Sequence, residues 1–272
     1  MYLGIDCATK LTANTAKGIR EAGYCFAGRY LVPPKVYTYK GLTEAEAKII
    51  TDAGLRMLTV WETTANRAMG GASSGAEDGE KARSCAEAIH MPTTGIIYFA
   101  VDFEAMPTDF PTIRAYLKAA REHTGDYEIG VYGSYRVIED IAKTGICKAY
   151  WQCVGWSYGK QSSHRNVYQA QWDKTVCGVN VDINECEDLD EAGTWTYQAG
   201  KAEEDDMLLR RYDTLDSMPD WAKPTVRKLI ELGFLKGNNG VTDKDGRPAD
   251  LDLSHDMVRM LVILDRSGVF GD

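Results

Sequence analysis

Eight short apolar runs, most of them separated by helical patterns, constrain the fold of this 272-residue chain more than any other feature. The strand-like runs are residues 2–6, 24–30, 55–61, 95–104, 128–133, 149–155, 166–171 and 178–183. Helical patterns cover residues 13–22, 43–53, 112–123 and 134–143, and another follows a Gly-, Ser- and Ala-rich loop at residues 69–75. Strands that alternate with helices favour a parallel sheet, and eight of them favour a closed α/β barrel of the TIM type.

The last third of this repeat is incomplete. Residues 155–165 are polar and Ser-rich, residues 173–177 have room only for a turn, and a short helical stretch at 185–192 is expected to close the domain. The barrel is therefore predicted to be degenerate in its last three strands, with an open doubly wound sheet as the alternative. The first strand lacks the glycines of a phosphate-binding loop, which argues against a nucleotide site.

The fourth run, Gly95 to Glu104, ends in two acids, Asp102 and Glu104. Side chains alternate across a strand, so an i, i+2 pair is expected to point the same way. Two carboxyls at the end of a buried strand raise at least one pKa, which suits general acid and base catalysis. The alternative is an acid pair on the surface just past the strand.

Other strand ends also carry acids, and chemistry in a barrel lies at the C-terminal ends of its strands. Asp6 ends the first strand, Glu62 follows the third, and Asp182 lies on the eighth. Since the first and eighth strands meet when a barrel closes, Asp6 and Asp182 are predicted to be neighbours. Aromatic and amide side chains end other strands: Tyr132, Trp151, Gln152, Gln169, Gln171 and Trp172. Acids among aromatic rings suit a sugar substrate; capping carboxylates and core packing are the alternatives.

Composition narrows the class of protein. The net charge of −9 argues against a general nucleic-acid-binding surface. No apolar run reaches the roughly 20 residues that span a bilayer, so no membrane partner is expected, and the N-terminus lacks the pattern of a signal peptide. The seven cysteines are expected to be reduced and buried. The four histidines are scattered, so neither a zinc site nor another cofactor is predicted.

Several short motifs fall in the order found in family 25 glycoside hydrolases, which are muramidases with five β/α units followed by three strands. They are Gly4-Ile5-Asp6, Val101 to Glu104, Gly130 to Tyr135, Gln169 to Trp172 and Val181 to Asn184. Gly28-Arg29-Tyr30 and Trp61-Glu62 bring the chain closer to a relative, the glycoside-hydrolase-like domain called domain of unknown function 1906. The resemblance covers residues 1 to about 192 and implies a glycoside-hydrolase-like barrel over residues 1–195.

This resemblance implies roles for individual residues. Glu104 resembles the general acid that protonates the glycosidic oxygen, and Asp102, Asp6 and Asp182 resemble its supporting carboxylates. Glu62 departs from the muramidase pattern, and together with Arg29 it joins the aromatic and amide residues as a candidate substrate contact. The resemblance implies a peptidoglycan hydrolase of endolysin or autolysin type that acts outside the cell or on its wall, released without a signal peptide. A non-catalytic carbohydrate-binding protein and, last, a phosphodiesterase are the alternatives.

Beyond the barrel, residues 196–217 are predicted to be a linker with a charge cluster at 201–206. Residues 218–272 are expected to form a small helical module, with a helix ending near Leu232 and another opened by Ser254. This helix pair resembles one copy of a surface-layer-homology module, which implies binding to the cell wall or pairing with a second chain. Trp221, Phe234 and Leu235 are its candidate contacts, and packing between the helices is the alternative.

Overall fold

A computed structural model describes residues 1–198 and 211–271 and divides the chain into two compact units, Met1–Gln198 and Ala199–Asp272. The charge cluster predicted at 201–206 lies outside the described residues. No helix within the described ranges is long and apolar enough to cross a membrane.

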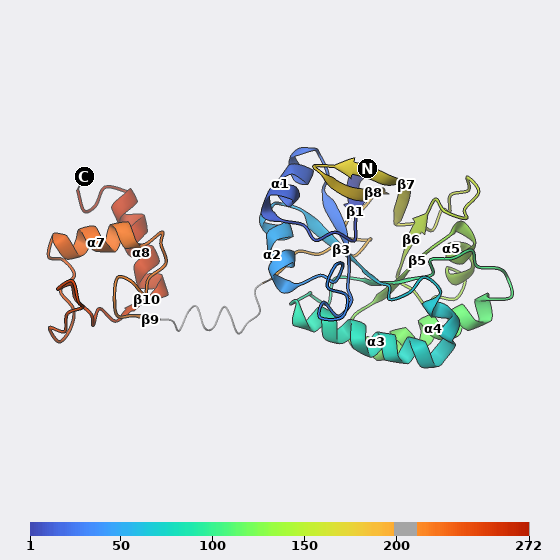
Figure 1. Ribbon diagram of the computed structural model, residues 1–272, viewed down its shortest axis with the longest axis horizontal. Coiled ribbons are helices and arrows are strands. Elements are labelled where there is room, and N and C mark those ends of the chain that lie inside the picture. Colours follow the sequence, from blue (N-terminus) through green and yellow to red (C-terminus); the bar gives the residue numbers. More distant parts are fainter. Residues whose placement is uncertain (199–210, 272) are drawn as a thin grey trace. The chain divides into compact units, whose positions relative to one another are not determined.

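The first unit is the expected eight-stranded closed barrel (Figure 1). Its strands are β1 (Tyr2–Asp6), β2 (Phe26–Tyr30), β3 (Arg56–Trp61), β4 (Ile97–Ala100), β5 (Ile129–Gly133), β6 (Ala149–Cys153), β7 (Val167–Val176) and β8 (Val179–Cys186). The helices outside them are α1 (Ala13–Glu21), α2 (Glu44–Asp52), α3 (Gly71–Ala88), α4 (Phe110–His123) and α5 (Tyr135–Ile141), and a 3₁₀ turn, η1 (Arg67–Gly70), precedes α3.

The barrel closes through an antiparallel strand rather than an eighth parallel one. Strands β1 to β7 pair in parallel, whereas β8 runs antiparallel to both β7 and β1. The turn predicted at residues 173–177 is largely strand, because β7 continues to Val176 and forms a hairpin with β8. The helix predicted at residues 185–192 does not form either, since β8 extends to Cys186 and turns follow it.

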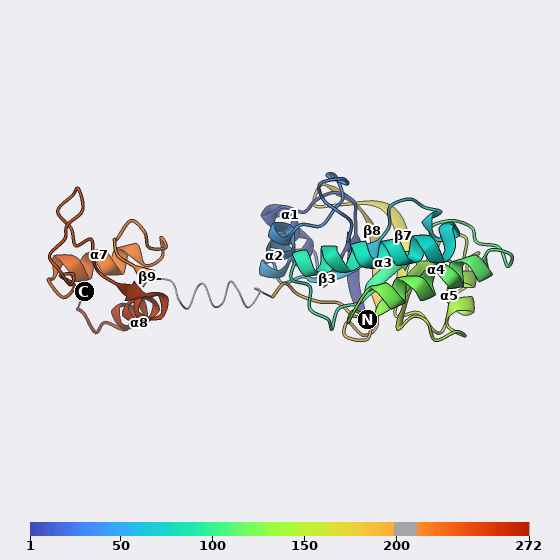
Figure 2. The same cartoon turned by 90° about the horizontal axis from the view of Figure 1, so that it is seen from below.

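Helices α3 and α4 lie side by side along the outside of the barrel (Figure 2). The loop predicted at residues 69–75 is instead the end of η1 and the start of α3, and Gly75 within it serves close packing. A Cβ on Gly75 would lie 2.1 Å from the carbonyl oxygen of Tyr116 on α4, and one on Gly79 would lie 2.5 Å from that of Ala120. The gain from packing α4 against this face outweighs the poor helix propensity of glycine.

Large side chains fill the inside of the barrel. Phe26, Tyr98 and Trp151 are fully buried there in one cluster, separate from the core between strands and helices. Their rings lie over glycines of neighbouring strands: a Cβ on Gly4 would lie 2.3 Å from the ring of Phe26, and one on Gly130 would lie 2.6 Å from that of Tyr98. These rings therefore fill the barrel below its mouth.

The last residues of this unit stay on the barrel, although residues 196–217 were predicted to be a linker. The backbone N–H of Trp195 bonds the carbonyl of Met57, and that of Tyr197 bonds the hydroxyl of Thr51 on α2. The Tyr197 hydroxyl donates to Glu44 at 2.8 Å.

The second unit contains α7 (Lys223–Glu231), α8 (His255–Arg266) and a two-stranded sheet of β9 (Arg211–Tyr212) and β10 (Leu253–Ser254). Both helices were predicted, and Ser254 caps α8 by accepting a bond from the Met257 N–H. Tyr212 and Leu215 belong to its core, so the module begins before residue 218. Trp221 and Phe234 are exposed, whereas Leu235 packs against the core.

Candidate active site at the barrel mouth

Nine residues line a cavity of about 130 Å³ at the C-terminal ends of the parallel strands. They are Asp6, Tyr30, Val60, Glu62, Asp102, Tyr132, Trp151, Gln169 and Asp182. The cavity thus gathers four carboxyls from four separate strands or strand ends. It is smaller than a typical ligand pocket of about 300–1,000 Å³, so only one group of a larger substrate fits inside and the rest must lie across the rim.

Asp6 is the centre of this site and is nearly buried, with 9% of its surface exposed. Its Oδ2 accepts hydrogen bonds from Gln169 Nε2 at 2.9 Å and from Asn184 Nδ2 at 2.7 Å. Both amides are oriented in turn, since Tyr132 donates to Gln169 Oε1 and Trp151 Nε1 donates to Asn184 Oδ1. Tyr132 and Trp151 therefore orient the two side-chain amides, and the amides in turn hold the Asp6 carboxyl.

Asp182 faces Asp6 directly, as predicted, because the two residues are partners in the β1–β8 register. The expectation that Asp182 ends its strand is wrong: β8 is antiparallel, so its first half lies at the mouth. Gln169 Nε2 bridges the pair with a bond of 3.0 Å to Asp182 Oδ2. The backbone N–H of Asp173 holds the other oxygen at 2.9 Å.

Lys40 is the cation of the mouth, and it is almost fully buried. Its Nζ lies 3.6 Å from Glu62 Oε1 and 4.3 Å from the centre of the Tyr30 ring. The site therefore joins one lysine to several acids. No group of three or more His, Cys, Asp or Glu residues in the described ranges is arranged to hold a metal ion.

Burial raises the pKa of each of the four mouth carboxyls. For Asp6, loss of solvation and the neighbouring Asp182 raise the pKa to about 7, against the hydrogen bonds from Asn184 and Gln169. Burial also raises the pKa of Asp182, and those of Glu62 and Asp102, where Lys40 acts in the opposite direction. The mouth therefore favours protonated carboxyls at a pH where exposed acids are ionised.

Glu104 lies apart from these carboxyls. Asp102 is half-buried and lines the mouth, whereas Glu104 is exposed and accepts a hydrogen bond from the Tyr158 hydroxyl. The prediction that they share one side of a strand is wrong, because β4 ends at Ala100 and its alternation does not extend to Glu104. Tyr158 comes from the loop between β6 and β7, where its φ of 51° is left-handed.

Arg29 is placed away from the mouth, contrary to its prediction as a substrate contact. Its side chain is fully buried, and its Nε lies 2.9 Å from Glu46 Oε1 on α2. The guanidinium also donates to the carbonyl oxygens of Cys7 and Lys40. Arg29 thus supports the mouth indirectly, by fixing the backbone that carries Lys40.

The other predicted contacts divide into three groups. Tyr132 and Gln169 line the mouth and take part in the Asp6 network. Trp151 also lines it, but its ring is buried edge-on against Tyr132, so it packs rather than offering a free face. Gln152 is fully buried and bonds the loop at Lys160 and Ser162. Gln171 and Trp172 are exposed on β7.

Three residues of the site were missed from the sequence: Lys40, Asn184 as a ligand of Asp6, and Tyr158. Asn184 stands in a quoted motif beside Asp182, which was an available signal. Lys40 and Tyr158 belong to loops without a recognisable pattern, and only the closed barrel brings them to the acids.

Comparison with known proteins gives the family and the fold. The family model for the Rv2525c-like, glycoside hydrolase-like domain matches residues 17–192. The uncharacterized protein YbfG of Bacillus subtilis is 34% identical over 165 residues, which cover 53% of this chain and 22% of that protein. The chain thus spans about a quarter of the length of the curated relatives it matches.

Two solved structures share the fold. The Tat-secreted protein Rv2525c of Mycobacterium tuberculosis superposes with a TM-score of 0.63 at 24% identity, covering 72% of this chain and 98% of that one. The catalytic domain of the endolysin ply40, from bacteriophage P40 of Listeria monocytogenes, gives a TM-score of 0.50 at 15% identity, covering 70% and 95%. At these identities the likeness supports the barrel alone.

Proposed function

We propose, from the premise that this chain belongs to the Rv2525c-like, glycoside hydrolase-like domain family, that its barrel cleaves glycosidic bonds of cell-wall peptidoglycan. The observation that carries the proposal is the convergence of Asp6, Glu62, Asp102 and Asp182 at one mouth, each with a raised pKa. Glycoside hydrolysis needs one carboxyl that gives a proton and another that supports the oxocarbenium-like transition state. The four acids beside one lysine provide candidates for the supporting role at the mouth.

In this proposal Glu104 is the general acid and Asp102, Asp6 and Asp182 are the supporting carboxylates. The small volume of the mouth supports this division, because a sugar chain does not fit inside and the scissile bond then lies outside the cavity. Glu104 follows the mouth residue Asp102 by two positions and is itself outside the cavity, where Tyr158 donates to it. Glu62, Tyr132 and Gln169 line the cavity that would receive one substituent of the sugar.

A second candidate is a non-catalytic protein that binds wall carbohydrate. The exposed position of Glu104, bonded by Tyr158 outside the mouth, favours it, because the proposed general acid is then not enclosed with the four mouth carboxyls. The same mouth would then bind a sugar without cleaving it.

The test compares Glu104→Gln and Asp102→Asn with Glu122→Gln, an exposed glutamate on α4, as the matched control. Purified peptidoglycan is incubated with each protein, and soluble products are analysed by mass spectrometry. We expect muropeptides with new reducing ends from the unchanged protein and the control, and at least a 100-fold loss in Glu104→Gln. Wall binding without any release of reducing ends by the unchanged protein would favour the second candidate. Full activity in Glu104→Gln would reject its role as the acid.

We also propose that the protein acts outside the cell or on its wall, and that residues 211–271 serve as a wall-binding or pairing module. The exposed Trp221 and Phe234 support this. Light scattering on the full chain and on a chain ending at residue 198 tests pairing, since a monomer in both cases contradicts it. Co-sedimentation of the two chains with purified walls tests wall binding, and equal retention of both contradicts it.

A further inference from the structure

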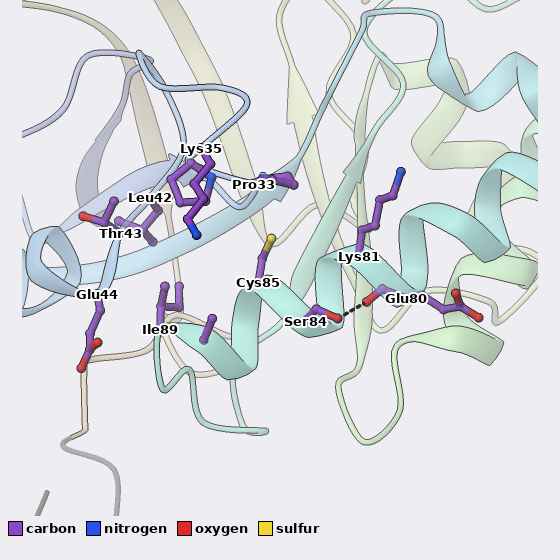
Figure 3. Close-up of a pocket in the computed structure, with 12 residues that line it drawn as sticks. Pro33, Lys35, Leu42, Thr43, Glu44, Glu80, Lys81, Ser84, Cys85 and Ile89 are labelled. Carbon is purple, nitrogen blue, oxygen red and sulfur yellow. Dashed lines mark hydrogen bonds between the residues drawn. The ribbon is translucent and has the colours of Figure 1, made fainter.

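A groove runs beside α3 from the rim of the barrel down its outer side. Its upper part has a volume of about 370 Å³ and includes Trp61, Thr63, Thr64 and Arg67. Its lower part, of about 570 Å³, lies between the loop after β2 and the second half of α3 (Figure 3). Pro33 and Lys81 line both parts, so the two pockets adjoin, and we call them together the α3 groove.

The groove exists because α3 packs along α4 and leaves a seam on its other side. Glycines on α3 bring α4 to within direct backbone contact, whereas α2 is not packed along α3. The far wall of the seam is the loop with Pro33 and Pro34, followed by Leu42. Figure 3 shows Cys85 pointing from α3 into the space that faces this wall.

The lining of the groove combines apolar floor and charged edges. Leu42, Ala88 and Ile89 contribute the apolar floor of the lower part. Lys35 and Glu80 stand at its edge, exposed and without an ion pair in the described part of the chain. An acyl chain would contact the apolar floor but would pair with neither charge. A bare sugar would not cover the apolar floor. A short peptide with apolar and charged groups matches both.

The upper part adds hydrogen-bond donors. Trp61 lines it and is 1% exposed, and its indole Nε1 has no acceptor among the described residues. That nitrogen is itself buried, so Trp61 contributes a wall of the pocket rather than an accessible donor. The hydroxyls of Thr63 and Thr64 line the same pocket.

The upper part also adjoins the mouth. Thr63 lines the groove and directly follows Glu62, which lines the mouth, so the end of β3 separates the two sites. A polymer with its sugar chain at the mouth and a peptide branch would reach the groove without leaving the surface.

We propose that the α3 groove binds the peptide branch of the wall glycan. This inference rests on the proposed function for its substrate, but its test needs no hydrolysis. The probes are the free stem tetrapeptide, the disaccharide carrying that tetrapeptide, and the disaccharide alone.

Cys85 lines the groove, so the rate at which its thiol is alkylated measures whether a ligand is bound there. The full-length protein is alkylated at about pH 9, because burial raises the pKa of the Cys85 thiol to about 11 and slows its reaction. Mass spectrometry of the peptides follows each cysteine separately, and the exposed Cys177 in the β7–β8 hairpin is the internal control. We expect the two tetrapeptide probes to slow alkylation of Cys85 at least threefold and to leave Cys177 unchanged, while the disaccharide alone protects neither.

Filling the groove gives the second arm. Ala88 is exposed on α3 and lines the groove, whereas Glu87 is exposed on the same helix and does not line it. Ala88→Trp is expected to weaken tetrapeptide binding at least tenfold by calorimetry, and the matched Glu87→Trp is expected to bind as the unchanged protein does.

Three results would overturn the inference: no protection of Cys85 by saturating tetrapeptide, equal binding in both tryptophan variants, or protection by an acyl chain or by rising protein concentration instead. Protection by the tetrapeptide in a protein that releases no reducing ends would reject the proposed hydrolase and keep the groove. If the protein hydrolysed glycan that lacks its peptide branches, and the tetrapeptide did not protect Cys85, the proposed hydrolase would stand and the groove proposal would be rejected.

Discussion

Replacing Asp6 by Asn should change how the stability of the protein depends on pH. The pKa of Asp6 rises from 3.8 to about 7 in the folded protein, mainly because the carboxyl is buried. Between these values the unfolded chain has released a proton that the folded chain still holds. Stability from this group is therefore full below about pH 4 and is lost as the pH rises to 7.

The size of this loss follows from the shift. A shift of about 3 pKa units at 1.36 kcal/mol each gives about 4 kcal/mol for a nearly buried group. The free energy of unfolding of the unchanged protein should thus fall by about 4 kcal/mol more than that of Asp6→Asn between pH 4 and pH 8. Other carboxyls titrate in both proteins and largely cancel in this difference.

Urea denaturation followed by circular dichroism at pH 4, 5, 6, 7 and 8 measures the effect. Asp126→Asn, at an exposed acid before β5, is the control and should follow the unchanged protein. A difference below about 1 kcal/mol would refute the reasoning. The opposite sign would mean that the amides of Gln169 and Asn184 stabilise an ionised Asp6 more than burial opposes it.

Two further predictions concern the scaffold that supports the mouth. Arg29→Met should lower the free energy of unfolding by about 3–5 kcal/mol, because it leaves the Glu46 carboxylate buried without its partner. Adding Glu46→Leu should restore part of this loss in urea denaturation; an unchanged stability of Arg29→Met would contradict a structural role. Gly75→Ala should cost about 1–3 kcal/mol or more, because its Cβ meets the Tyr116 carbonyl at 2.1 Å. Thermal denaturation checks this, with Ser73→Ala on the exposed side of α3 as the control. Equal melting temperatures would show that α4 can move away without loss of stability.

Local patterns in the sequence were enough for the barrel and for most of its acids. Apolar runs and capping residues such as Thr43 determine where strands and helices begin, because both depend on residues close together in the chain. Asp6 and Asp182 were predicted as neighbours because any closed barrel joins its first and last strands, whatever the direction of the last one.

Tertiary packing decided what local patterns leave open. The glycines at the start of α3 are typical of a loop, and only the approach of α4 makes them helical. Arg29 pairs with Glu46 instead of lying in the mouth. Its side chain is on the outer face of its barrel strand, where a buried charge needs a partner of opposite sign.

The position of Glu104 shows the same limit at the site itself. Its spacing from Asp102 predicts a shared face only if the strand continues. Strand β4 ends at Ala100, and the backbone N–H of Asp102 bonds the carbonyl of Ala65 in the loop after β3 instead of a neighbouring strand. The sequence by itself determined which acids reach the rim of the barrel. Which of them are buried, and therefore have raised pKa values, was decided by loops and strands distant in the chain, because solvation depends on everything that surrounds a carboxyl in space.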